Sequence, residues 1–230
     1  MDRLINMRSN KIEEYKKTLK LSEFQRQVLI GTLLGDGCLE TRNQGKTFRL
    51  KIEHSIAQKD YVDWKYQVFK NFTLSEPRIH KRVSYGSVRE NYCFSTVSHG
   101  SLRFYGQQFY KNGKKMMPKI IYKMITPLAL AVWFMDDGSI KSKQHRALVI
   151  HSQSFNKQDL LNIIEVLDKK YGIKLTLRKR EDGSGYVLYL LSKTVSKFID
   201  LVKEYVLPSM EYKLGNIIAQ KVTEAFIKVG

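Results

Sequence analysis

The chain has 230 residues, 43% of them hydrophobic, and carries a formal net charge of +18 at pH 7. A chain of this size buries roughly 70% of its unfolded surface in one or two compact domains, and so large a basic excess favours a polyanionic partner, nucleic acid before a membrane surface. Because the sequence has no signal-peptide core, no membrane-spanning apolar run and only two cysteines, without metal-ligand spacing, we expect a soluble intracellular protein that is neither secreted nor membrane-bound.

The first half of the chain contains an apolar helix with an unusual ending. The stretch VLIGTLLGDG, residues 28–37, has no charge before Asp36, which predicts a buried helix. Ser22 and Gln25 form a capping-box pattern before it, and Gly31 and Gly35 lie on one helical face, where they would let another backbone approach closely. A strand, a helix, a hairpin and a helix are then predicted at residues 47–55, 58–72, 78–97 and 98–110.

The second half repeats this order after a junction around residues 111–123. A second uncharged helix begins at Thr126 and Pro127, in the usual order of cap and then proline, and it runs into the sequence DDG at residues 136–138. A strand, a helix, a hairpin, a helix and one more helix are predicted at residues 147–155, 156–172, 174–191, 192–206 and 216–228.

This repetition predicts the fold class and the domain organisation. We expect an α+β protein made of two pseudo-symmetric αββαββα modules, residues 1–118 and 119–230. Two homologous halves usually pack about a pseudo-twofold axis through the same patch on each. The two uncharged helices are the natural patch, because no other segment is apolar all round.

The carboxylates that end the two uncharged helices are electrostatically out of place. A helix C-terminus already carries partial negative charge, so Asp36 and Asp137 are unfavourable there and would repel each other side by side. Aspartate followed by glycine is also a common helix ending that needs no function. Two such endings at matching places in a duplicated chain favour a divalent cation between them, since Mg²⁺ binds carboxylate oxygen and takes substrate phosphate as a further ligand. The pattern therefore predicts metal-assisted phosphodiester hydrolysis.

Two nonapeptides carry a family resemblance. The stretches LIGTLLGDG, residues 29–37, and LAVWFMDDG, residues 130–138, resemble the two motifs of the single-chain LAGLIDADG homing endonucleases, and the resemblance extends over nearly the whole chain, although Val132 stands where the family often has glycine. It implies a saddle of antiparallel sheets on long DNA and Mg²⁺-dependent cleavage of both strands, with Mn²⁺ substituting and Ca²⁺ supporting binding without cleavage. By the same resemblance, Asp36 and Asp137 are the metal ligands and Asp136 is a bystander.

The resemblance also implies four further polar residues at the cleavage centre. Lys115 in GKKMMP and Lys213 in EYKLGN match the lysines that the family places near the scissile phosphates, where a compact positive charge can stabilise a developing phosphorane or orient a water molecule. Gln153 in HSQSF and His54 in EHSIA match the polar position that organises water around the metal. Solvated surface lysines and a strand-end histidine without a role are the alternatives.

DNA contacts are expected from the outward faces of the predicted strands, because a two-stranded β-ribbon fits the major groove. Arginine and lysine there can read guanine or hold phosphates. The candidate DNA-binding residues are Arg49, Lys51, Arg78, His80, Arg82, Lys174, Arg178 and Arg180.

These features predict a monomeric, site-specific endonuclease that binds a long, asymmetric double-stranded DNA site and leaves a staggered break, without an obligate protein partner. The alternatives are an RNA maturase that assists intron splicing, or a non-cleaving DNA-binding regulator, on the same fold. Retained acids in both motifs favour the enzyme, although maturase activity can coexist with them. The protein would act wherever its target genome lies: an organelle, a bacterial cytoplasm or a nucleus.

Overall fold

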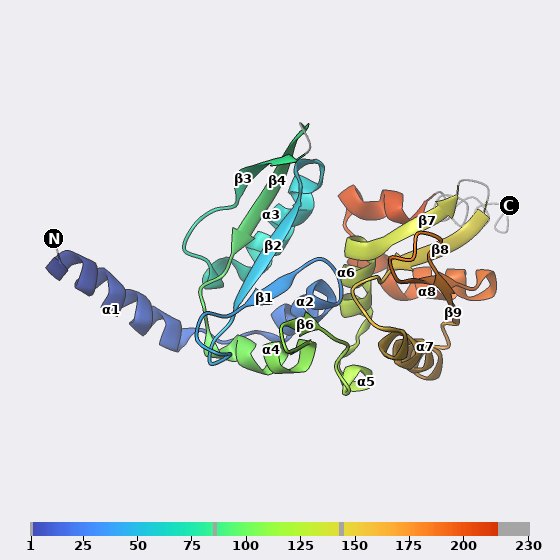
Figure 1. Ribbon diagram of the computed structural model, residues 1–230, viewed down its shortest axis with the longest axis horizontal. Helices are drawn as coiled ribbons and strands as arrows, with labels where there is room; N and C mark the ends of the chain where they lie inside the picture. Colours follow the sequence, from blue (N-terminus) through green and yellow to red (C-terminus); the bar gives the residue numbers. More distant parts are fainter. Residues whose placement is uncertain (1, 85–86, 143–144, 216–230) are drawn as a thin grey trace, which may run out of the picture. The chain divides into compact units, whose positions relative to one another are not determined.

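The computed structural model describes residues 2–84, 87–142 and 145–215, which belong to two compact units (Figure 1). The first unit comprises the chain up to residue 26 together with residues 39–106, and the second comprises residues 27–38 together with the chain from residue 107. The single module boundary at residue 118 stays a prediction. The helix expected at 216–228 lies outside the described residues. Within the described part of the chain, no helix is both long and apolar enough to cross a bilayer.

The first unit is built on a four-stranded sheet with the strand order β1-β2-β4-β3, in which β4 pairs antiparallel with both β2 and β3. Helix α3 lies along one face of this sheet and contacts β2 and β4 (Figure 1). The elements are α1 (Asp2–Thr18), β1 (Cys38–Glu40), β2 (Arg49–Ser55), η1 (Ile56–Gln58), α3 (Lys59–Phe69), η2 (Lys70–Phe72), β3 (Arg78–Ser84), β4 (Ser87–Ser95), η3 (Gly100–Leu102) and α4 (Arg103–Phe109).

Strand β2 confirms the alternation predicted from its sequence. Its even-numbered residues from Leu50 to His54 are buried, and its odd-numbered residues from Arg49 to Glu53 are half-buried. Since successive strand residues point to opposite faces, one face of the sheet is apolar and the other is polar. We call the face that carries Arg49 to Glu53 the polar face of the first sheet.

The N-terminal helix α1 was not predicted, because its sequence is polar and charged around most of its circumference. Its C-terminal end is held by contacts to distant parts of the first unit: the Tyr15 hydroxyl donates to the Asn71 carbonyl at 2.7 Å, and the His99 Nε2 lies 2.9 Å from the Lys16 carbonyl oxygen. Long-range contacts of this kind cannot be read from helical periodicity.

The second unit contains a sheet with the corresponding strand order, β7-β8-β10-β9. This shared topology confirms the predicted α+β class with antiparallel sheets and a duplicated strand arrangement. The elements are α2 (Glu23–Leu34, which begins in the first unit), β5 (Tyr110–Lys111), β6 (Lys114–Lys115), α5 (Ile121–Met124), α6 (Pro127–Asp137), β7 (Gly138–Ser142), β8 (His145–His151), α7 (Lys157–Tyr171), β9 (Leu175–Lys179), β10 (Tyr186–Leu190), α8 (Ser192–Val202), η4 (Lys203–Tyr205) and η5 (Pro208–Leu214).

Helices α2 and α6, which contain the two motifs and are called the motif helices, begin at the predicted caps. The Ser22 hydroxyl accepts from the Gln25 amide at 3.1 Å, and the Gln25 side chain accepts in return from the Ser22 amide at 3.0 Å, which completes a capping box before α2. Thr126 caps α6 by accepting from the Ala129 amide at 3.1 Å, with proline at the first helical position.

Residues 27–34 of α2 pack against α6 inside the second unit, and two glycines of the α2 motif allow the two helices to approach closely. A Cβ at Gly31 would lie within 3.0 Å of the Ala129 carbonyl oxygen and of the Val132 Cβ, and one at Gly35 would lie equally close to the Asp136 side chain. Val132, which replaces the family's usual glycine, therefore fits over Gly31. The predicted packing of the two motif helices is confirmed.

We expect Gly31→Ala to destabilise this helix pair by roughly 1–3 kcal/mol or more, because the new methyl group meets a backbone oxygen that cannot move aside. Gly100→Ala is the matched control, since nothing lies within 4 Å of a Cβ there. Urea unfolding of both variants measures the difference. A Gly31→Ala protein as stable as the control would contradict the close packing.

Candidate functional site

The two motif helices end in similar turns that present the predicted acids. After α2, the Gly35 amide donates to the Gly31 carbonyl at 3.0 Å and the Gly37 amide to the Thr32 carbonyl at 2.9 Å, which leaves Asp36 exposed between them. Helix α6 ends with Asp137, and Gly138 has an extended conformation with φ −77°. Neither final glycine has a positive φ, so the left-handed cap that could have explained each Asp-Gly ending without a function is not formed.

Three carboxylates gather where these helices end; we call Asp36, Asp136 and Asp137 the acid cluster. Carboxylate oxygens of Asp36 and Asp136 lie within 4.8 Å of each other, and the Asp36 amide donates to Asp136 Oδ2 at 3.2 Å. Asp137 Oδ2 accepts from the buried Trp133 Nε1 at 3.1 Å. Asp136 has a structural contact of its own, because its buried carboxylate accepts from the chain of the first motif; its role as a bystander to the metal stays a prediction.

The acid cluster is electrostatically unfavourable without a cation. Burial, together with the negative charges of Asp36 and Asp136, raises the pKa of Asp137 to about 8, although the hydrogen bond from Trp133 and the charge of Lys115 oppose the rise. The neighbouring negative charges that help to keep the proton on Asp137 at neutral pH would also stabilise a positive charge at this place. Carboxylate oxygens are the ligands that Mg²⁺ prefers, so the donor set fits a hard divalent cation.

The raised pKa of Asp137 predicts a pH dependence of stability in the metal-free protein. The folded state binds this proton more tightly than the unfolded state, so the free energy of unfolding should fall as pH rises from about 4 to about 8, by up to about 1.4 kcal/mol per pKa unit. In Asp137→Asn this contribution is absent. Urea unfolding in EDTA should therefore show that the wild type loses more unfolding free energy between pH 5.5 and pH 8 than Asp137→Asn does. Equal losses in the two proteins would contradict a raised pKa at Asp137.

Two lysines point into the same region from segments far apart in sequence. The Lys115 ammonium donates to the carbonyl oxygens of Gly35 at 2.6 Å and Gly37 at 3.1 Å, at the end of α2. The Lys213 ammonium donates to the carbonyl oxygens of Met135 and Asp136, both at 2.6 Å, at the end of α6. Each lysine thus satisfies terminal carbonyls of one motif helix and offsets its negative dipole.

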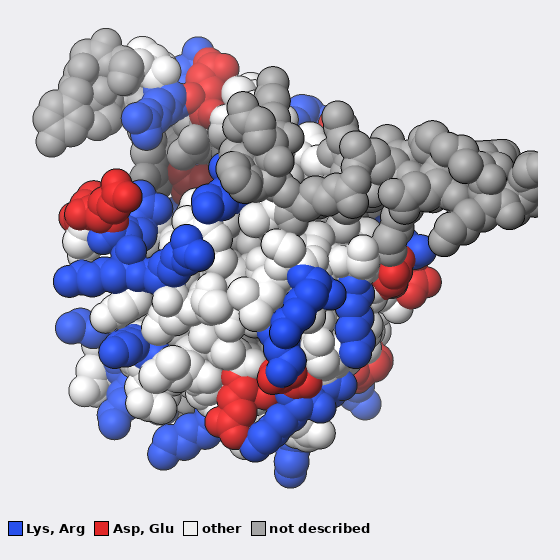
Figure 2. All heavy atoms as spheres, turned by 90° about the vertical axis from the view of Figure 1, so that its right-hand side faces the viewer, with Lys and Arg blue, Asp and Glu red and all other residues white. Residues whose placement is uncertain are grey.

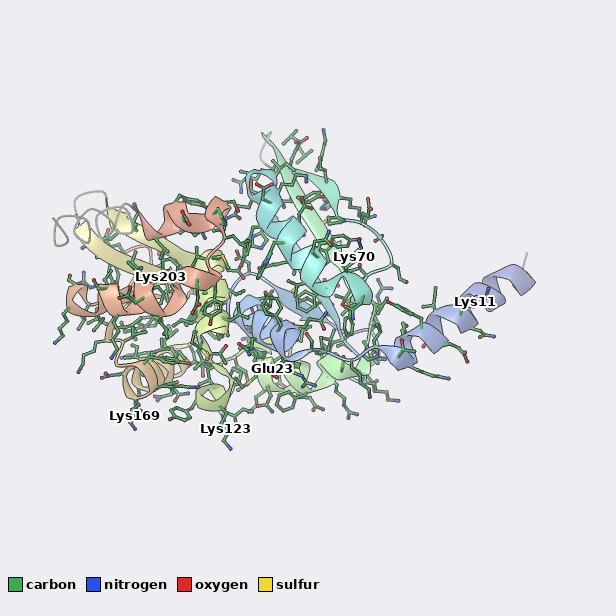
Figure 3. The ribbon with its side chains drawn as sticks, turned by 180° about the vertical axis from the view of Figure 1, so that it is seen from behind. Lys11, Glu23, Lys70, Lys123, Lys169 and Lys203 are labelled. Atoms are coloured by element: carbon green, nitrogen blue, oxygen red, sulfur yellow. The ribbon has the colours of Figure 1, made fainter. Side chains whose placement is uncertain are left out.

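Neither lysine is the solvated surface residue that was the alternative. Both are half-buried, and burial lowers the pKa of Lys115 even though the carboxylates of the acid cluster oppose the shift. Lys123 and Lys169, in contrast, extend from the outside of the second unit into solvent (Figure 3).

Lys115 is placed by a short hairpin that the sequence analysis treated as a junction between modules. Strands β5 and β6 are joined by Asn112 and Gly113, which have φ values of 51° and 74°; positive φ at both central residues is typical of a tight hairpin turn, and Asn-Gly favours it. The Asp159 carboxylate then accepts from the Met117 amide at 3.1 Å, which fixes the chain just after β6.

The remaining two predicted centre residues, Gln153 and His54, come from other elements of the fold. Gln153 is exposed in the turn after β8, and no contact in the described part of the chain joins it to the acid cluster. His54 belongs to the first unit and is buried on the face of β2 that packs against α3. Its Nδ1 lies 3.2 Å from Gln58 Oε1 and its Nε2 lies 3.4 Å from the fully buried Lys65 Nζ. The roles of Gln153 and His54 stay predictions.

The polar face of the first sheet forms a groove of about 590 Å³. Arg49, Lys51, Arg78 and His80, all candidate DNA-binding residues, line it. Acidic partners hold some of these side chains: a guanidinium nitrogen of Arg49 lies 2.5 Å from a Glu40 carboxylate oxygen. Arg82 lies in β3, but its side chain is outside the described part.

The second sheet carries a groove of about 600 Å³, which Arg178 and Arg180 line together with Lys141 and Tyr189. The Tyr189 ring has the Arg178 guanidinium 4.5 Å and the Lys141 ammonium 5.6 Å from its centroid. Lys174 does not line this groove, and its ammonium pairs with Asp168 of α7 at 3.5 Å. Figure 2 shows lysine and arginine side chains spread over the face of this unit, with acidic side chains among them.

A duplicated α+β topology, with two helices that lead into acids, is the arrangement that the resemblance to the LAGLIDADG family implies. The sequence pattern of the LAGLIDADG DNA endonuclease family matches residues 26–198, so the chain belongs to this family. The resemblance seen in the two nonapeptides is confirmed.

Individual relatives extend over most of the chain. It is 30% identical over 213 residues to the probable intron-encoded endonuclease 1 of Wickerhamomyces canadensis, covering 90% of each protein. It is 32% identical over 194 residues to the cytochrome b mRNA maturase bI2 of Debaryomyces hansenii, covering 83% of this chain and 73% of the relative. Among solved structures, the homing endonuclease I-WcaI bound to its DNA recognition sequence matches with a TM-score of 0.82 and 30% identity, covering 88% of this chain and 91% of that one.

Proposed function

We propose that this protein is a site-specific homing endonuclease that acts as a monomer, binds a long, asymmetric double-stranded DNA site and hydrolyses both strands to leave a staggered break. The observation that carries the proposal is the acid cluster. Both motif helices lead into carboxylates there, and one lysine donates to carbonyl oxygens at the end of each helix. A protein that only bound DNA would gain nothing from such a concentration of negative charge. The similarity to I-WcaI supports the choice of substrate.

Asp36 and Asp137 would hold divalent metal, with Mg²⁺ the physiological ion, Mn²⁺ a substitute and Ca²⁺ an ion that supports binding without cleavage. When bound, such ions supply activation of water and stabilisation of the leaving oxygen. The Trp133 indole keeps the Asp137 carboxylate oriented, and Asp136 ties the end of α2 to the end of α6. The protein's own contribution is therefore a rigid set of oxygens prepared for cations.

The two lysines would contribute positive charge to the reacting phosphates. Each ammonium donates to two carbonyl oxygens, which fix its position. A lysine positioned in this way stabilises charge that develops on a phosphate oxygen, or orients a water molecule, without reorganising during the reaction. Gln153 and His54 are proposed to organise the surrounding water.

The two sheet grooves would hold the DNA. Each of them is lined by arginine and lysine. Selection of cleaved sites from a randomised duplex library with Mg²⁺ tests the whole proposal. The expected result is one long consensus with staggered ends. Recovery of random ends, or of no ends, would refute site-specific cleavage.

Binding to the selected duplex should weaken steeply with salt. Each phosphate neutralised by lysine or arginine contributes about −0.9 to the slope of log K against log salt, so a chain that makes about six to ten such contacts should give a slope near −5 to −9. Fluorescence anisotropy between 50 and 300 mM KCl, without divalent metal, measures it. A slope shallower than about −2 would contradict binding through the basic grooves.

An RNA maturase is the second candidate, because a relative at 32% identity is named as a cytochrome b mRNA maturase. A maturase function requires binding to an intron RNA, and cleavage is not part of it. Splicing of the host intron with wild type and with Asp137→Asn separates the two functions. A protein that neither cleaves DNA nor aids splicing, yet binds one duplex, would instead be a regulator.

A further inference from the structure

A carboxylate on the polar face of the first sheet has no obvious place in a DNA-binding groove. The Glu53 side chain lines this groove and is only 13% exposed. Its Oε1 accepts from Asn91 Nδ2 at 2.8 Å, and its Oε2 lies 3.0 Å from Lys51 Nζ. His80 Nδ1 lies 3.9 Å from Oε1. A negative charge here repels phosphates, so it must serve some purpose other than backbone affinity.

Asn91 lies on the same face of the sheet. It lies on the central strand β4, in register with Ser55 of β2 and His80 of β3, and it shares a face with Cys93, which lines the groove. An ionised carboxylate only accepts hydrogen bonds. Glu53 therefore fixes the orientation of the Asn91 amide: Nδ2 points toward the carboxylate, and a flipped amide would place Oδ1 against it without a hydrogen bond.

The rest of the Asn91 amide is left available. One Nδ2 proton is used by Glu53, while the second Nδ2 proton and Oδ1 have no side-chain partner among the described residues. An acceptor and a donor side by side, on the sheet face that carries the groove-lining Cys93, match the edge of adenine in the major groove: Oδ1 accepts from N6–H and Nδ2 donates to N7.

We propose that Asn91 reads an adenine in the DNA half-site bound by the first unit, and that Glu53 is the positioning residue that sets the orientation of its amide. This inference rests on the proposed function. Lys51, on the same face, balances the charge of Glu53 so that the groove keeps its attraction for phosphate.

The second sheet offers different chemistry to its half-site. Its groove is lined by Tyr189, whose ring centroid lies 4.5 Å from the Arg178 guanidinium and 5.6 Å from the Lys141 ammonium. Arginine and lysine favour guanine O6 and N7.

The experiment is binding selection from a randomised duplex DNA library in EDTA, followed by sequencing of bound DNA for four proteins. Wild type should select a consensus with one adenine position that Asn91→Ala loses, with discrimination there falling roughly 5- to 150-fold and other positions unchanged. Glu53→Gln should admit guanine at the same position, because glutamine can donate to a reversed Asn91 amide and turn both Nδ2 protons toward the base. Glu90→Gln is the matched control, since Glu90 lies on the opposite face of β4 and pairs with Lys81 at 2.8 Å.

The outcomes separate the two levels of the proposal. A wild-type protein that selects no consensus refutes the proposed site-specific function itself. A wild-type consensus that Asn91→Ala leaves unchanged at every position overturns the reading of adenine by Asn91. If thermal melting shows that Asn91→Ala does not fold, Glu53→Gln decides: an adenine preference equal to that of the control overturns the proposal, and admission of guanine supports it.

Discussion

Replacement of Asp36 or Asp137 by asparagine is expected to abolish double-strand cleavage while DNA binding persists. Asparagine keeps the size of each side chain but removes the negative charge that would hold a divalent ion, and a bound metal contributes several kcal/mol to stabilising the transition state of hydrolysis. The rate should therefore fall by roughly 10³-fold or more. Because each acid comes from a different helix, neither can replace the other. Single-turnover cleavage of the selected duplex with Mg²⁺ measures the rate.

Asp200→Asn is the charge-matched control for these variants. Asp200 lies on α8, is half exposed and pairs with Lys203 at 3.3 Å, so its loss should leave cleavage unchanged. DNA binding in EDTA should be equal or slightly tighter in Asp36→Asn, because a negative charge facing phosphates is gone. It should be unchanged in Asp137→Asn, because the Asp137 carboxyl group, whose pKa is raised to about 8, keeps its proton at neutral pH when no metal is bound. Full activity in either single variant would eliminate that residue as a ligand.

Lys115→Met is expected to slow cleavage by roughly 10²- to 10³-fold, the usual effect of removing one fixed group that stabilises developing charge. The dissociation constant for DNA should change much less, because Lys115 is only one positive charge in a chain with a formal net charge of +18. The substitution also leaves the carbonyl oxygens of Gly35 and Gly37 without their donor, at a cost to stability of about 1–3 kcal/mol.

Lys114→Met is the matched control, because Lys114 precedes Lys115 in β6 and is exposed. Cleavage rate, DNA affinity and urea stability are measured for both variants at a temperature where both are folded. If the cleavage rate and the DNA affinity of Lys115→Met fell by the same factor, Lys115 would act only as a phosphate contact. An unchanged cleavage rate would show that Lys115 only caps helix α2.

The features predicted correctly from sequence are those with local signals. A capping box before α2, a Thr-Pro start to α6 and the alternation in β2 each involve residues within a few positions of one another, and the structure confirms them. The acids at the helix ends were found because charge of the wrong sign at a helix terminus is itself a local signal.

The features that were missed depend on contacts across the fold. Asp136 meets the Asp36 amide 100 positions away, and Lys115 meets Gly35 80 positions away, so neither partner could be assigned before the two helices were brought together. The pairing of Asn91 with Glu53 depends on the register of β4 against β2, which hydrophobic alternation does not fix between strands. The β5–β6 hairpin is a different case. Asn112 and Gly113 are typical of a tight turn, but the strands on either side have only two residues each, which is too short for a recognisable strand pattern.

Binding of Mn²⁺ to the complex of the protein with its selected duplex, followed by electron paramagnetic resonance, tests the central claim most directly. The account predicts that wild type removes Mn²⁺ from solution and that the Asp36→Asn/Asp137→Asn double variant, bound to the same DNA, does not. A double variant that takes up Mn²⁺ as tightly as wild type would contradict the assignment of a metal centre to the ends of the two motif helices.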